Sequence, residues 1–132
     1  MTVRDSEIGW TNADNSGNTG YGIRVHGSSL GSSDRLKIVG NRIHHIAGDG
    51  IQGLGNGTDV LIDRNEIGYV GANPGSSEHS DNIQIIDNGP NLKITNNWLH
   101  HQGWYDATTS VGNAGATYIH GGDSDRMTYE NT

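Results

Sequence analysis

A short pattern recurs along this chain: two apolar residues two positions apart, an asparagine three positions later, and another apolar residue two positions on. It is met in the segments 36–43, 60–67 and 92–99, which bring Asn41, Asn65 and Asn97 to the same point. The segment 3–8 fits with Ser6 in the place of asparagine. The corner residues are separated by 35, 24 and 32 positions, so a constant core carries connections of variable length. Such recurrence predicts structural units that stack on one another.

A second pair of apolar residues follows each asparagine segment with strand-like alternation. The pairs are Ile23/Val25, Ile51/Gly53, Ile83/Ile85 and, more weakly, Thr117/Ile119. Stretches of three to five residues with a period of two indicate strands and are too short for helices. Successive copies run in one chain direction and bury their apolar stripe only by stacking, so we expect parallel strands about 4.8 Å apart.

The asparagine at a fixed corner has a physical reason. Its short amide side chain tolerates tight-turn backbone and can hydrogen-bond to the equivalent amide one unit away. We therefore expect a ladder through Ser6, Asn41, Asn65 and Asn97. The same alignment predicts one interior column that contains Ile38, Ile62 and Ile94.

The composition fits one repeat domain over residues 1–132. Hydrophobic residues make up 31% of the chain, without a phenylalanine, which is lean for an ordinary globule but sufficient for the thin core of a stacked repeat. The 21 glycines and the many polar residues suit turns. Disorder is the alternative for so polar a chain, but it gives no reason for isoleucine to recur at matched positions.

The net charge and the residue content limit the classes of molecule that we expect the chain to bind. The net charge of −7 and only 8 Lys and Arg disfavour nucleic acid. No run approaches the roughly 20 apolar residues that span a bilayer, so no membrane partner is expected. The lack of cysteine excludes disulfides and thiolate metal sites and fits an extracellular or secreted protein, although no signal peptide opens the chain.

The two ends of the repeat lead to a further expectation. The pattern starts almost at Met1 and stops within a unit at residues 127–132, and neither end shows an amphipathic capping helix. Uncapped terminal units would expose apolar strand edges. We expect the chain to be part of a longer stack of repeats that is incomplete at both ends. Self-association through the open ends is the alternative.

The asparagine-corner pattern, together with the segments Gly-Asp49-Gly-Ile51-Gln and Ser-Asp81-Asn-Ile83-Gln, resembles the parallel β-helix repeats of the pectin-lyase-like superfamily. The resemblance spans roughly residues 3–132. It implies an all-β fold: a right-handed, single-stranded parallel β-helix, or solenoid, of about four coils. That superfamily contains polysaccharide lyases, polygalacturonases, epimerases and phage tailspikes, so it implies a carbohydrate-active protein that binds or cleaves a polysaccharide, or a non-catalytic structural or adhesive solenoid.

Asp49 and Asp81 are the sharpest catalytic candidates, because they share one position on adjacent coils. Stacked carboxylates about 5 Å apart repel, so one can hold a proton while the other stays ionised, as a glycosidase requires. The pair is similar to polygalacturonase motifs, but Ser80 and Gly115 stand where that family has an aspartate and a histidine. The alternative is that each aspartate caps a turn by accepting backbone N–H bonds.

Further candidates surround this pair. His79 lies two residues before Asp81, where it could hydrogen-bond that carboxylate or could simply be a solvated loop residue. The outward residues of the same strands and one exposed indole are the expected substrate-binding groups: Arg24, Gln52, Gln84, Tyr118 and Trp104.

Two histidine pairs, at 44–45 and 100–101, align with Gly68 and Tyr69 of the coil between them. We expect His45, Tyr69 and His101 to stack along one edge. His44 and His100 would lie two coils apart, about 10 Å, too far to share one zinc ion. A neighbouring outward stripe of alternating charge is predicted: Glu7, Arg42, Glu66 and Trp98.

No metal or cofactor is expected from these motifs. The segment 12–23 begins like a calcium-binding loop, but Ile23 occupies the position where that loop needs a glutamate. A calcium ion that bridges the protein to an anionic polymer is the alternative, and no motif supports it.

Overall fold

The computed structural model describes residues 1–11, 20–25, 34–53, 57–71, 80–102, 114–122 and 128–130. This part of the chain is all β, with thirteen strands and no helix. The strands are β1 (Thr2–Arg4), β2 (Glu7–Thr11), β3 (Ile23–Val25), β4 (Lys37–Val39), β5 (Arg42–Ile46), β6 (Ile51–Gly53), β7 (Leu61–Asp63), β8 (Glu66–Val70), β9 (Ser80–Asn88), β10 (Lys93–Thr95), β11 (Trp98–Gln102), β12 (Ala114–Gly122) and β13 (Thr128–Glu130).

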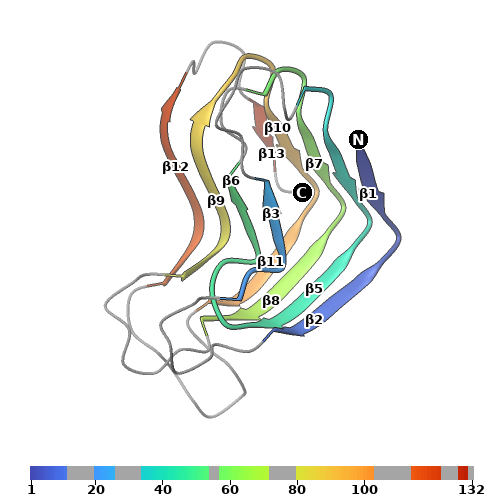
Figure 1. Cartoon of the computed structure of the whole chain (residues 1–132), viewed down its shortest axis with the longest axis vertical. Helices are drawn as coiled ribbons and strands as arrows, with labels where there is room; N and C mark the ends of the chain where they lie inside the picture. Colours follow the sequence, from blue (N-terminus) through green and yellow to red (C-terminus); the bar gives the residue numbers. More distant parts are fainter. Residues whose placement is uncertain are drawn as a thin grey trace.

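The strands form three sheets that the chain visits in turn (Figure 1). Sheet A has the order β1-β4-β7-β10-β13, sheet B the order β11-β8-β5-β2, and sheet C the order β12-β9-β6-β3. All ten neighbouring pairs are parallel. One passage of the chain through sheets A, B and C is called a coil below. The expectation of short parallel strands that stack coil on coil is confirmed.

The core consists of apolar columns in register across the coils. Ile38, Ile62 and Ile94 pair with one another in sheet A and are at most 2% exposed, which confirms the predicted interior column. Sheets B and C contribute matching columns: Ile43/Ile67 and Ile51/Ile83. Alternate residues of each short strand point inward, so a chain with few hydrophobic residues still builds one continuous core.

The corner between sheets A and B carries the predicted asparagine ladder. The backbone N–H of Asn41 and its Nδ2 both donate to Oδ1 of Asn65, at 2.9 and 3.0 Å. Asn65 makes the same two bonds, both 2.9 Å, to Oδ1 of Asn97. At the N-terminal end of the ladder, the backbone N–H of Ser6 donates to Oδ1 of Asn41 at 3.2 Å. Each amide thus satisfies a turn N–H that would otherwise be buried without a partner.

Two strands of sheet C are longer than the sequence pattern indicated. β9 and β12 each span nine residues and pair from Ser80 with Ala114 to Asn88 with Gly122. The expected limit of five residues is wrong there. β6 instead ends at Gly53, where φ is +109° and the backbone approaches Val25 so closely that a Cβ would overlap its carbonyl oxygen. The end of β6 therefore depends on glycine, whereas Ile85 pairs with Gly53 from within β9.

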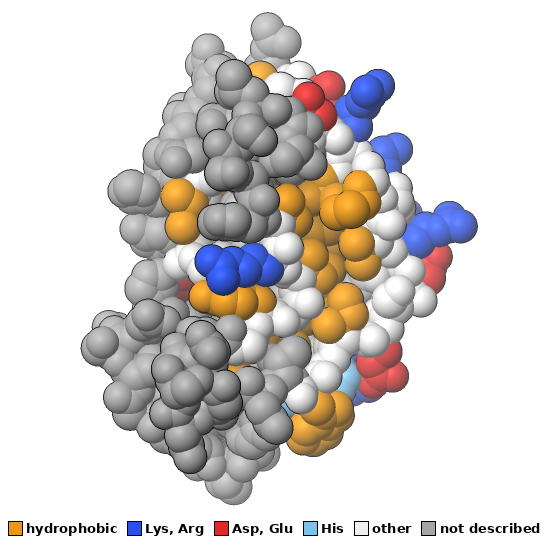
Figure 2. Space-filling model, viewed as in Figure 1, with side chains coloured by type: hydrophobic (Ala, Val, Ile, Leu, Met, Phe, Trp, Pro, Cys, Tyr) orange, Lys and Arg blue, Asp and Glu red, His pale blue; other side chains and the backbone are white. Residues whose placement is uncertain are grey.

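In the view of Figure 2, hydrophobic side chains gather in the middle of the face, and most of the visible charged side chains lie along its right edge, with one basic side chain near the centre. Val3, Ile8 and Val25 of the first coil are only partly buried where they pack against the core. In the described ranges there is no helix long and apolar enough to cross a membrane.

Candidate functional site

The turn before sheet C brings the two candidate carboxylates together. Ile51 pairs with Ile83, so Asp49 and Asp81 occupy equivalent positions on adjacent coils, as predicted. The backbone N–H of Asp81 donates to Oδ1 of Asp49 at 2.8 Å, and Nε2 of Gln52 donates to Oδ2 at 2.8 Å. Both aspartates are 3% exposed. Asp49 therefore caps the turn of the next coil with one oxygen and holds a glutamine with the other.

The outward ladder of sheet C has the predicted register. Arg24 pairs with Gln52, Gln52 with Gln84, and Gln84 with Tyr118. Nε2 of Gln52 also donates to Oε1 of Gln84 at 2.7 Å, so the two amides and Asp49 form one network. Arg24 is exposed, and its guanidinium lies 4.5 Å from the centre of the Tyr21 ring, a cation–π contact.

Three members of the predicted site are not placed with their side chains. His79 and Trp104 lie outside the described residues, and for Tyr118 only the backbone position in β12 is described. Gly115 pairs with Asp81. The position where polygalacturonases have a histidine is thus occupied by glycine, in the register that the sequence predicted.

The edge of sheet B carries a column of stacked rings. His45 and Tyr69 stack at 4.9 Å between ring centres, and Tyr69 and His101 stack at 4.4 Å, which confirms the predicted stack. Trp10 extends the column by stacking on His45 at 4.0 Å, a member that the sequence alignment did not include. All four residues have φ between +49° and +61°, so the chain bends at each ring.

Two glutamate–histidine pairs were also not predicted. Nε2 of His44 lies 2.9 Å from Oε1 of Glu7, and Nε2 of His100 lies 3.5 Å from Oε1 of Glu66. A signal was present in the sequence. Coils one and three read Glu-Ile-Gly-aromatic at 7–10 and 66–69, whereas coils two and four read apolar-His-His at 43–45 and 99–101. A search for a period of two coils would have found the pairs.

The predicted charge stripe is present on the outer face of sheet B. Arg42 lies between two carboxylates, with Nη1 3.1 Å from Glu7 and Nε 3.6 Å from Glu66. The hydrogen bond from His44 and the positive charge of Arg42 hold the pKa of Glu7 below its ordinary value. Glu7 is therefore a carboxylate at neutral pH and remains one in mild acid.

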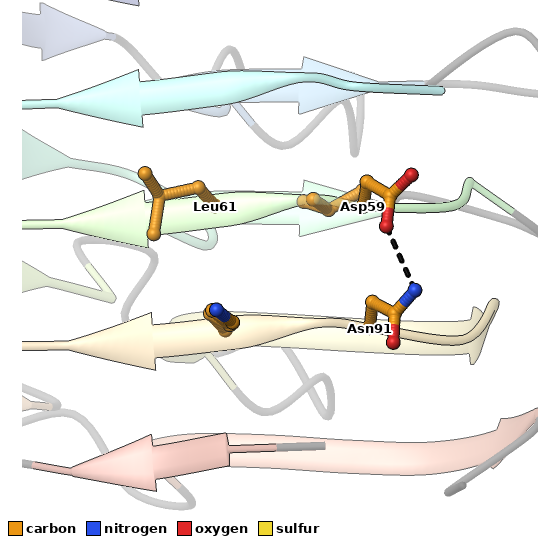
Figure 3. A pocket seen from close by; sticks show the side chains of 5 residues that line it. Asp59, Leu61 and Asn91 are labelled. Atoms are coloured by element: carbon orange, nitrogen blue, oxygen red, sulfur yellow. Dashed lines mark hydrogen bonds between the residues drawn. The ribbon is translucent and has the colours of Figure 1, made fainter. Parts of the chain in front are cut away.

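A groove of about 290 Å³ lies on sheet A, apart from the Asp49 network of sheet C and from the rings and charges of sheet B. It is lined by Asp59, Val60, Leu61, Asn91 and Lys93. Figure 3 shows Asp59 and Asn91 joined across adjacent coils by a hydrogen bond of 2.8 Å. Because this bond satisfies the most polar pair in the groove, the groove is a feature of the turn and carries no converging reactive groups.

Among the described side chains, no three His, Asp or Glu residues converge as a metal site would require. Comparison with known proteins gives no further guide, since no protein-family model, curated protein or solved structure matches the chain.

Proposed function

We propose that the chain is a segment of a right-handed parallel β-helix of the pectin-lyase-like kind, and that it binds a polysaccharide across the outer face of sheet C. The observation that carries the proposal is the polar ladder of Arg24, Gln52 and Gln84, which repeats one group per coil in register and presents an exposed Arg24 and a partly exposed Gln52 beside a buried Gln84. A linear glycan also repeats its hydroxyls at regular intervals, and amides and guanidinium groups hydrogen-bond to hydroxyls.

The network around Asp49 favours binding over bond cleavage. Both carboxylate oxygens of Asp49 already accept hydrogen bonds from the protein, so neither is held ready for a substrate proton. The same bonds orient the Gln52 amide. In this proposal Asp49 is a positioning residue for the binding ladder.

Cleavage is the second candidate, because Asp49 and Asp81 stand on adjacent coils as a carboxyl pair. An acid–base mechanism would use one as proton donor and the other as base or nucleophile, with His79 beside them. An extracellular location and the absence of a required cofactor belong to the same proposal. A structural or adhesive solenoid is the outcome that remains if no glycan binds.

The test is a screen of immobilised neutral and acidic polysaccharides, scored for retention and for release of reducing ends. Retention without release is the expected result. If release occurs, Asp49→Asn and Asp49→Ala separate the two roles of Asp49. The carboxamide oxygen can still accept the Asp81 N–H, so Asp49→Asn keeps the turn bond but not the carboxyl chemistry, whereas Asp49→Ala loses both. Release would establish cleavage, and loss of turnover in a stable Asp49→Asn protein would assign it to the Asp49 carboxyl. A folded parent that retains no glycan would refute the binding proposal.

A further inference from the structure

The alternation of coils in sheet B places a glycine opposite His44 and opposite His100. His44 pairs with Gly9 on one side and Gly68 on the other, and His100 pairs with Gly68. A Cβ added at Gly9 would lie 2.8 Å from Cε1 of His44, and one at Gly68 would overlap the His100 ring more severely. Each imidazole therefore leans over the preceding coil into space that only glycine leaves open.

Each leaning histidine connects two further groups. We call Glu7, His44 and His45 the first unit. In it, Nε2 of His44 lies 2.9 Å from Oε1 of Glu7, and Nδ1 of His44 lies 2.8 Å from Nδ1 of His45. In the second unit, Glu66, His100 and His101, the two Nδ1 atoms are 2.6 Å apart. The same arrangement is built twice, each time from a glutamate on one strand and a histidine pair at least 34 positions later on another, so it is a property of the fold.

We propose that these two Glu–His–His units bind protons as coupled pairs and make the ring stack of sheet B a pH-responsive element. Each unit takes up one proton with its bonds intact, and a second proton breaks the Nδ1–Nδ1 bond and releases the stacked imidazole. This inference is independent of the proposed glycan binding.

The number of protons on the ring nitrogens decides whether the Nδ1–Nδ1 hydrogen bond can form. Two nitrogens at 2.8 Å form a hydrogen bond only when one of them carries the proton and the other has its lone pair free. In a neutral first unit the two ring protons sit between His44 and Glu7 and between the two Nδ1 atoms. One more proton is accommodated on Nε2 of His45. A further proton puts N–H groups on both Nδ1 atoms, and two cations then face each other without a bond.

The charged groups around the rings favour the first of these steps. Facing the units are Glu7 from β2, Arg42 from β5 and Glu66 and Tyr69 from β8, with the four imidazoles themselves on β5 and β11. Glu7 and Glu66 carry two negative charges against one on Arg42, so the row has a net charge of −1 before any imidazole is protonated. One added proton per unit changes this to +1.

The two units differ in how readily they take up protons. Nε2 of His100 is buried and has no hydrogen-bond partner among the described residues, since Glu66 stands 3.5 Å away. Burial and the neighbouring His101 lower the pKa of His100, and Glu66 only partly opposes them. Glu66 thus stabilises a charged His100 less than Glu7, at 2.9 Å, stabilises a charged His44, and the second protonation step is harder in the second unit.

Loss of the Nδ1–Nδ1 bond acts on the stack directly. His45 is held between Trp10 and Tyr69, and His101 lies on the far face of Tyr69. Each ring sits on backbone of positive φ, which non-glycine residues adopt only when their surroundings enforce it. An imidazole released from its partner nitrogen no longer enforces that bend.

The experiment is nitrogen NMR of histidine side chains in the whole chain between pH 8 and pH 4.5. We expect a through-bond coupling between the Nδ1 atoms of each unit at pH 8, two separate titration steps per unit, and ring-current shifts on His45 that persist through the first step and vanish at the second. Backbone spectra should remain those of the folded chain through the first step.

Glu7→Gln and Glu66→Gln are the matched variants. Glu7→Gln should move the first step of the first unit to lower pH and leave the second unit unchanged, and Glu66→Gln should do the reverse with a smaller shift. Four histidines that titrate independently in single steps, with ring-current shifts unchanged throughout, would overturn the proposal. So would global unfolding that coincides with the first step.

Discussion

Two of the corners of each coil are closed in opposite ways. The corner between sheets A and B repeats one residue type, and Asn41, Asn65 and Asn97 are at most 3% exposed. The corner between sheets B and C alternates aromatic and histidine residues, and Trp10 is 65% exposed. The first corner is closed by neutral hydrogen bonds from coil to coil, and the second by ring stacking and shared protons. A buried, uniform corner fixes the register of the coils, whereas the alternating corner leaves aromatic rings in contact with solvent.

The largest effect is expected at the core on which both corners depend. Ile62→Asp would bury an unpaired charge between two coils, and we expect the cooperative unfolding transition to be lost, a cost above about 4 kcal/mol. Leu61→Asp on the same strand is the control, because Leu61 points outward and is only partly buried. Urea unfolding followed by circular dichroism measures both. Equal stability of Ile62→Asp and the parent would contradict the stacked-coil description.

Asn65→Ala breaks the first corner at its centre. Asn65 accepts two bonds from Asn41 and donates to Asn97 and to the carbonyl oxygen of Ile38, so we expect a loss of about 1–3 kcal/mol of unfolding free energy. Asn97→Ala removes one fewer of the observed bonds and should cost somewhat less. The loss at Asn65 should be the same at pH 8 and pH 5.5, since no amide titrates. Negligible losses at both positions would remove the ladder from the account.

Gly68→Ala tests the second corner through packing. The new methyl group would push the His100 ring away from Glu66 and from His101, and overpacking of this kind costs about 1–3 kcal/mol. Gly9→Ala is the matched variant, and its smaller overlap with His44 predicts a smaller loss. Unfolding free energies in urea rank the pair. The reverse order would show that the histidines do not occupy the space over these glycines.

The smallest expected effect is the pH dependence of stability that His100 contributes. Its pKa in the folded chain is below the ordinary value of 6.5, so the unfolded chain binds the proton more tightly. The contribution is fully present above pH 6.5 and is lost as the pH falls through the lower pKa of the folded state. Unfolding free energies of the parent and of His100→Gln, compared at pH 7.5 and 5.5, should differ in slope, with the variant less dependent on pH. A steeper slope in the variant would contradict this assignment.

The same contrast explains what the sequence could predict. The asparagine corner was readable because one residue type recurs at one position, and identical positions in parallel coils must meet. The charge stripe and the stack of His45, Tyr69 and His101 followed from the same alignment. The Glu7–His44 contact was not predicted, because it joins different residue types on different coils and depends on a ring leaning into the space over Gly9.

The candidate site of sheet C shows a second limit. Register placed Asp49 beside Asp81 and Gln52 beside Gln84, and the structure agrees. The partners of the Asp49 oxygens depend on the local turn, which alignment alone does not resolve. The choice between a reactive carboxyl pair and a turn cap therefore needed the hydrogen bonds of 2.8 Å that Asp49 accepts.

The most direct test of the account is whether glycan binding belongs to sheet C rather than to the exposed rings of sheet B. Affinity electrophoresis in gels that contain the polysaccharide retained in the screen would compare Arg24→Ala and Gln52→Ala with Trp10→Ala and Trp98→Ala. The account predicts that the two sheet C variants lose at least about tenfold in affinity, about 1.4 kcal/mol, while the two sheet B variants bind like the parent. Unchanged binding by the sheet C variants, with loss in the tryptophan variants, would contradict it.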